Sequence, residues 1–184
     1  MSTRAYLMIK NGAEVRYCFT HWDGYNHGDE LRQMSQDEIK AIWDKLGDTS
    51  KAWYFDSFMS EPSRKQTVDY YKEQVAKEPD SSVYKESLVR YKKYKPIPEL
   101  AGEEPDSSTS GIFQLENGKL PDNADKLPPM TGDSFIFIEF VWVYDMKTGK
   151  IYYYTSWQPE HLNKKKFAVQ YKRHLYRSEN FCGD

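Results

Sequence analysis

Two histidines and an aspartate lie close together in one short stretch, directly after a predicted strand. The spacing of His21, Asp23 and His27 would allow a single loop to bring their side chains together. Such a set can bind a metal ion, or it can act as general acid, general base and orienting group on a phosphodiester. Arg4, near the start of the chain, could assist. One candidate function is therefore a small nuclease or phosphodiesterase acting on RNA or DNA.

The same stretch has two other interpretations. Trp22, Gly24 and Tyr25 could form a recognition surface, because Gly24 lets the backbone turn sharply or approach a partner closely. Alternatively the turn could be structural, with Asp23 accepting backbone N–H bonds while Trp22 and Tyr25 fill the core. No second cluster of carboxylates or histidines completes a metal shell in the sequence. We therefore expect no metal and no other cofactor.

Other reactive residues give weaker signals. Cys18 and Cys182 lack the spacing of a disulfide framework or a zinc site, so two free thiols are expected. Removal of Met1 would expose Ser2 as an N-terminal nucleophile, although serine at this position is common. The sequence contains no phosphate-binding loop, dinucleotide fingerprint, G-x-S-x-G, HExxH or Cys-x-x-Cys motif.

Composition limits the class of protein. The 184 residues fit one domain, 1–184, and 16% of them are aromatic, so rings must supply much of the buried area. A net charge of −2 argues against general affinity for nucleic acid, since such affinity requires an excess of Lys and Arg over a surface. No signal peptide or membrane span is recognised, so we expect a cytoplasmic protein with no membrane partner.

The predicted elements lie mainly at the two ends of the chain. Residues 3–10 and 14–20 alternate as strands around Asn11-Gly12, which is a strong hairpin signal. Ser35 and Glu38 form a capping box before a helix over 36–46. Further helices are expected from a cap at Ser63 to residue 77 and over 82–94, packed as an antiparallel pair, while the aromatic run 51–59 is left unclassified.

Residues 134–144 form the strongest predicted strand and are apolar on both faces, which favours a central position in the sheet. Glu139 interrupts this pattern and would need a partner if buried, and Arg4 is the candidate. A turn containing Gly149 leads to a strand over 151–157. We therefore predict an α+β fold in which the N- and C-terminal β-hairpins share one antiparallel sheet, with the helical insertion 36–94 against one face.

Two charged segments could contact partners. Residues 96–133 carry eight acids and two lysines, which predicts a long acidic loop that is either solvated or able to occupy a positively charged channel through Glu103, Glu104 and Asp106. Within it, 111–115 could attach to the core. The basic tail is either a solvated face or a surface for nucleic-acid phosphates. Its binding candidates are Lys164, Lys165, Lys166, Lys172, Arg173 and Arg177.

Three short motifs resemble a family of small proteins carried by bacteriophages and other mobile elements. They are Ser2-Thr3-Arg4, His21-Trp22-Asp23-Gly24-Tyr25 and Val141-Trp142-Val143-Tyr144-Asp145. Small phage proteins without a catalytic signature are often inhibitors of host defence, and type II anti-CRISPR proteins have a similar size. The resemblance thus implies a counter-defence protein in the host cell, with Cas9, its guide RNA or another defence protein as the expected partner.

Overall fold

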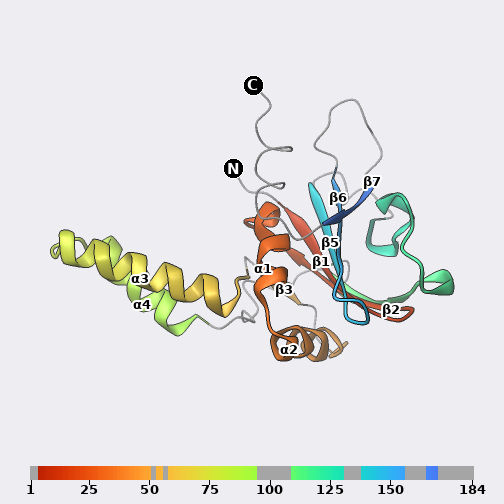
Figure 1. The fold of residues 1–184 in the computed structure, drawn as a ribbon, viewed down its shortest axis with the longest axis horizontal. Coiled ribbons are helices and arrows are strands. Elements are labelled where there is room, and N and C mark those ends of the chain that lie inside the picture. Colours follow the sequence, from red (N-terminus) through yellow and green to blue (C-terminus); the bar gives the residue numbers. More distant parts are fainter. Residues whose placement is uncertain are drawn as a thin grey trace, which may run out of the picture.

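A β-sheet forms the centre of the fold (Figure 1). The computed structural model describes residues 4–50, 53–55, 58–94, 109–130, 138–155 and 165–169. The strands are β1 Ala5–Asn11, β2 Glu14–Thr20, β3 Tyr54–Phe55, β4 Ser110–Gln114, β5 Phe140–Asp145, β6 Ile151–Thr155 and β7 Lys165–Val169. The helices are α1 His27–Gln33, α2 Gln36–Leu46, α3 Glu61–Lys77 and α4 Ser82–Lys93. The sheet has the order β3-β2-β1-β5-β6-β7, and β4 also pairs with β2.

Both predicted hairpins are confirmed. β1 and β2 pair antiparallel around Gly12, whose φ of 68° needs the freedom of glycine. β5 and β6 pair antiparallel around a turn in which Gly149, at φ 67°, donates its N–H to the Asp145 carbonyl oxygen at 2.7 Å. The turn residues therefore fix the register of each hairpin, as the sequence indicated.

The two hairpins share one sheet, as expected, but β1 and β5 run parallel, so the sheet is mixed and not wholly antiparallel. The Arg4 carbonyl oxygen, just before β1, accepts the N–H of Glu139 at 2.9 Å, which confirms that these segments are neighbours. A parallel pair needs a long crossover connection, which the residues between the hairpins supply. The apolar pattern of β5 on both faces predicted burial correctly but does not specify strand direction.

A buried ion pair joins the two central strands at one end. Lys10 Nζ lies 2.8 Å from Asp145 Oδ2, and both side chains are largely buried. The other carboxylate oxygen of Asp145 accepts the backbone N–H of Lys147 at 3.0 Å. The carboxylate thus bonds the β1 lysine and the turn after β5 together.

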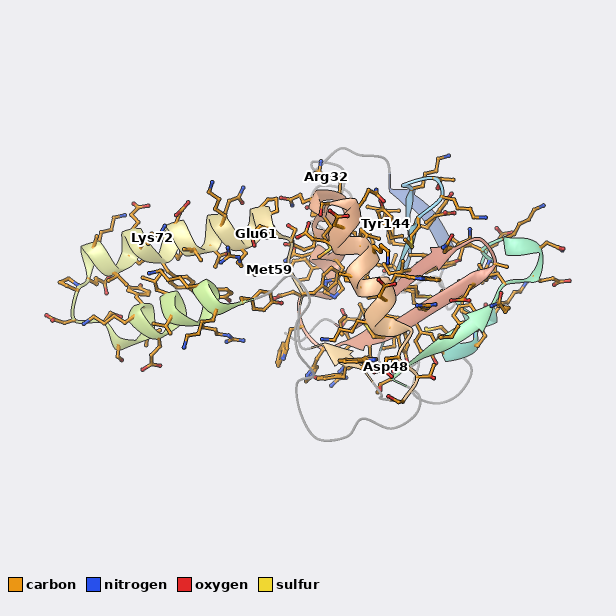
Figure 2. The ribbon with its side chains drawn as sticks, turned by 90° about the horizontal axis from the view of Figure 1, so that it is seen from below. Arg32, Asp48, Met59, Glu61, Lys72 and Tyr144 are labelled. Carbon is orange, nitrogen blue, oxygen red and sulfur yellow. The ribbon has the colours of Figure 1, made fainter. Side chains whose placement is uncertain are left out.

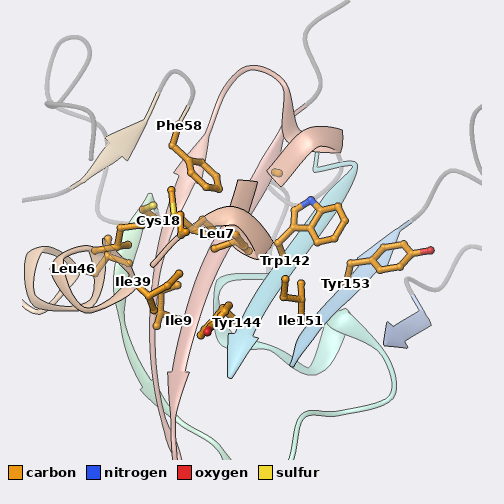
Figure 3. Close-up of a cluster of buried hydrophobic side chains, with 14 of the residues drawn as sticks. Leu7, Ile9, Cys18, Ile39, Leu46, Phe58, Trp142, Tyr144, Ile151 and Tyr153 are labelled. Atoms are coloured by element: carbon orange, nitrogen blue, oxygen red, sulfur yellow. The ribbon is translucent and has the colours of Figure 1, made fainter. Parts of the chain in front are cut away.

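Helices α1 and α2 cover one face of the sheet (Figure 3). Leu31, Ile39, Ile42 and Leu46 pack there against strand residues that include Leu7 and Trp142. The predicted capping box is present, since Ser35 and Glu38 bond each other's backbone N–H groups. The packing of α2 on one face is confirmed, and α1, which the sequence did not predict, lies beside it.

Residues 115–130, within the segment 96–133 that the sequence predicts as a long loop, cover the opposite face of the sheet. β4 confirms the expected attachment near 111–115, and three short 3₁₀ turns follow it. Leu115, Ala124, Leu127 and Met130 are buried against β1, β5 and β6. This cover lacks helical or strand periodicity, so hydrophobic spacing could not reveal it. The acids Glu103, Glu104 and Asp106 lie outside the described residues.

Helices α3 and α4 form an antiparallel hairpin, residues 61–93, which we call the arm. It projects from the layer formed by α1 and α2 (Figures 1 and 2). The two helices pack as an antiparallel pair, as predicted. The seam between them is aromatic, and the rings of Tyr71 and Tyr91 stack at 5.5 Å. The predicted start at Ser63 is wrong: Ser60 is the N-cap and accepts the Ser63 N–H, because Pro62 is well suited to the first turn.

Two carboxylates of the sheet-covering helices hold the base of the arm. Glu30 of α1 accepts the Ser60 N–H at 2.6 Å, and Glu38 of α2 accepts the Glu61 N–H at 3.2 Å. Acidic groups are favourable here, because the first N–H groups of a helix have no partner within it and carry partial positive charge. Burial raises the pKa of Glu30 even though its hydrogen bonds with Ser60 and Ser63 act in the opposite direction.

Candidate functional site

The His-Trp-Asp-Gly-Tyr loop, residues 21–25, connects β2 to α1. Asp23 adopts a left-handed conformation, with φ 56°, and its carbonyl oxygen accepts the Asn26 N–H at 2.8 Å. A 3₁₀ turn over Gly24–Asn26 then leads directly into α1 at His27. The chain therefore reverses within a few residues, and His27 belongs to a helix and not to the loop that the sequence indicated.

Trp142 of β5 anchors this loop from beneath. Its indole Nε1 donates a hydrogen bond to the Gly24 carbonyl oxygen at 2.6 Å, and the whole side chain is buried. Gly28 lies against the same ring, and a Cβ placed there would come within 2.3 Å of Trp142 Cζ3. Two of the short motifs noted in the sequence, 21–25 and 141–145, thus meet in space. Sequence reasoning missed this partner, although Trp142 stood in one of those motifs.

His27 is fully buried at the base of the loop. Its Nε2 lies 2.6 Å from Thr20 Oγ1, and the Thr20 hydroxyl donates to the Ala5 carbonyl oxygen at 3.1 Å. Since the hydroxyl has one proton, His27 is the donor to Thr20 and carries its own proton on Nε2. Burial lowers the pKa of His27 to about 3, and its ring packs on Phe58 at 4.2 Å. At neutral pH this histidine is an uncharged part of the core.

His21 and Trp22 lie on the other side of the loop. The His21 ring is 4.6 Å from Trp22, 6.0 Å from Tyr54 and 6.2 Å from Phe19. Trp22 is 44% exposed, and Asp23 beside it is also exposed. Phe19 stacks on Tyr54 at 5.4 Å and supports this group from the sheet. The loop therefore exposes the indole of Trp22 to solvent, next to the packed rings of His21, Phe19 and Tyr54.

The structure separates the predicted catalytic residues. Thr20, which bonds His27, points to the helix-covered face of β2, whereas Phe19, which packs on His21, points to the other. Within the described ranges, no group of three His, Cys, Asp or Glu side chains is placed to hold a metal ion. Arg4 is half-buried just before β1. The arrangement thus offers His21 and Asp23 at the surface, without His27.

Two side chains near the site bear on the other predictions. Tyr25 packs against the core under α1 and α2, so it is structural as well as part of the loop. Cys18 is buried in β2, and burial raises its thiol pKa, so this cysteine is held in its neutral, unreactive form.

Most of the predicted basic surface lies outside the described residues. Lys165 and Lys166 belong to β7, where their backbones pair with Thr155 and Tyr154 of β6. This pairing makes residues 165–169 of the tail a strand. Lys164, Lys172, Arg173 and Arg177 lie beyond the described ranges.

Comparison with known proteins gives no relative for this chain. No family model, curated protein or solved structure matches it. Among the described residues, no helix is both long enough and apolar enough to cross a membrane.

Proposed function

We propose that this chain is a recognition protein that binds its partner through the His-Trp-Asp-Gly-Tyr loop. The observation that carries the proposal is the exposure of Trp22 on a loop whose base is fixed by Trp142 and His27. Exposed tryptophans held in one position are typical anchors of protein interfaces, because they bury a large area with little loss of side-chain freedom.

The partner that we propose is a bacterial defence complex, with Cas9 bound to its guide RNA as the specific case. The support for this choice is the resemblance to mobile-element proteins, whose natural targets include host defences. The exposed carboxylate of Asp23, next to Trp22, is suited to a basic partner surface, and such surfaces line the channels that hold guide RNA. Binding at this site would act by obstruction and would need no chemical step.

A phosphodiesterase is the second candidate, but it has less support. His27 is buried and hydrogen-bonded to Thr20, so it is not positioned to take a proton from a substrate in solvent. His21 and Asp23 could still act as a pair at the surface. The burial of His27 is the reason that we place recognition first.

A pull-down from lysate of a Cas9-encoding host tests the binding proposal. The tagged chain is compared with Trp22→Ala and with Tyr70→Ala, a matched control because Tyr70 is a similarly exposed aromatic residue, at 53%, on the arm. We expect Trp22→Ala to lose the captured complex and Tyr70→Ala to retain it. Equal capture by both variants would refute the loop as the interface.

Inhibition is measured directly with purified Cas9, guide RNA and a target duplex. The wild-type chain should slow cleavage in a dose-dependent manner, and Trp22→Ala should require at least tenfold more protein for the same effect. Cleavage unaffected by a molar excess of the wild-type chain would exclude Cas9 as the partner.

A further inference from the structure

The outer face of α4 carries an excess of positive charge. The exposed charged side chains of this helix are Lys85, Glu86, Arg90, Lys92 and Lys93. Lys85 shares one stripe of the helix with Val89, Lys92 and Lys93, which follow it by four, seven and eight residues. Val89 within that stripe is 52% exposed, which shows that the stripe faces away from α3.

Charge on α3 is arranged differently, because each of its acids is engaged by a base on the same helix. Glu61 pairs with Arg64, Asp69 with Lys72 at 2.7 Å and Glu73 with Lys77 at 2.7 Å. The hydrogen bond from Lys72 lowers the pKa of Asp69, as the bond from Lys77 does for Glu73. In the part of the chain that the structure describes, the charged side chains of α4 form no ion pair.

The seam of the arm orients this stripe toward solvent. Tyr71 of α3 stacks on Tyr91 of α4, which fixes the inner face of α4. Arg64 Nη1 donates to the carbonyl oxygens of Tyr91 and Lys92, at 3.4 and 3.5 Å, near the end of the helix. Because Arg64 satisfies these carbonyls, the ammonium groups of Lys92 and Lys93 are not required there.

The position of Lys85 also favours an external ligand. It lies close to the N-terminus of α4, where the helix has no acidic residue in its first turn and where a cation is unfavourable. A residue that opposes its local electrostatics, with no ion-pair partner among the described residues, often serves a function.

We propose that the outer face of α4 binds the phosphodiester backbone of a nucleic acid. Lys85 and Lys92 are seven residues apart, which is about 10 Å along the helix. A duplex presents one charge per ~1.7 Å of its axis, so this distance spans about six phosphates. Such contacts would be independent of base sequence and would release counterions. This surface is separate from the His-Trp-Asp-Gly-Tyr loop and does not depend on it.

Fluorescence anisotropy with labelled oligonucleotides tests the proposal on the purified full chain. Single- and double-stranded RNA and DNA of one sequence distinguish the two sources of phosphodiester. The test variant combines Lys85→Gln, Arg90→Gln, Lys92→Gln and Lys93→Gln. Its control combines Lys65→Gln, Lys72→Gln and Lys77→Gln on α3, and circular dichroism verifies that both variants remain helical.

We expect the α4 variant to bind at least tenfold more weakly at low salt, with a salt dependence reduced by about one unit of slope per lost phosphate contact. The α3 control and Trp22→Ala should bind like the wild type, so failure here is distinguishable from failure of the loop proposal. Equal losses in the α3 and α4 variants, no binding by the wild type, or binding only to phosphatidylserine vesicles would overturn the proposal.

Discussion

Gly28 lies directly against the indole ring of Trp142, so close that a methyl group at residue 28 would overlap the ring by more than an ångström. This contact joins the first turn of α1 to the central strand β5 and sets the height of the preceding loop above the sheet. It also reverses the usual effect of replacing a helical glycine.

Gly28→Ala should therefore destabilise the protein by about 1–3 kcal/mol, as expected of overpacking in a core, whereas alanine normally stabilises a helix relative to glycine. Urea unfolding measures the change. Unchanged or increased stability of Gly28→Ala would contradict the role given to Trp142.

Stability should fall in mild acid because of His27. Its folded pKa is about 3 and the ordinary value is 6.5, so below pH 6.5 the unfolded chain binds a proton that the folded chain does not. The contribution of uncharged His27 to the free energy of unfolding is thus fully present above pH 6.5. It is lost progressively as the pH falls toward 3. Linkage gives a loss of about 2 kcal/mol between pH 7.5 and pH 5.

Urea unfolding across this pH range checks the expectation. His27→Gln should be less stable than wild type at pH 7.5 but should lose about 2 kcal/mol less on acidification. Val89→Ala, a change on the exposed face of α4, should keep the wild-type pH dependence. If His27→Gln kept the wild-type pH dependence of stability, another group would be responsible for that dependence.

The Lys10–Asp145 pair should show strong energetic coupling. Lys10→Met leaves the buried carboxylate of Asp145 without its cation, which costs about 3–5 kcal/mol when one partner of a buried pair is removed. Asp145→Asn leaves the lysine unpaired in the same way. The double variant should be markedly more stable than the sum of the single losses predicts, and simple additivity would show that the two groups do not interact.

Nuclease assays decide between the two proposed functions. The wild-type chain is incubated with labelled RNA and DNA, with and without Mg²⁺ or Mn²⁺, beside His21→Ala and Asp23→Ala. The recognition proposal predicts no hydrolysis in any of these reactions. Hydrolysis by the wild type that disappears in both variants would establish the catalytic alternative.

The ends of the chain could be predicted because their signals are local. Asn11-Gly12 and Gly149 mark turns by their backbone freedom, and the capping box of Ser35 and Glu38 marks a helix by two hydrogen bonds close in sequence. The α+β class followed from these elements. The parallel contact of β1 with β5 could not be predicted, because side-chain alternation is the same for both strand directions.

The candidate site was harder to predict, because the role of each of its residues depends on contacts with residues distant in sequence. His21 and His27 look equivalent in the sequence, but Thr20 and Phe58 place one of them in the core. Trp142 lies far along the chain from the loop that it anchors. The cover over 115–130 is formed by isolated leucines and a methionine between short turns, a pattern that composition assigns to a loop.

The attachment of the arm has a consequence for multivalent binding. The loop ends where α1 begins, and Glu30, one turn further along α1, holds the first residues of the arm. A single short helix therefore sets the separation between Trp22 and the arm. For a target that contacts both surfaces, the second contact becomes intramolecular, and two weak contacts can give avidity far above either affinity. A target whose own two sites do not match that separation would gain nothing, so the geometry of α1 selects among targets.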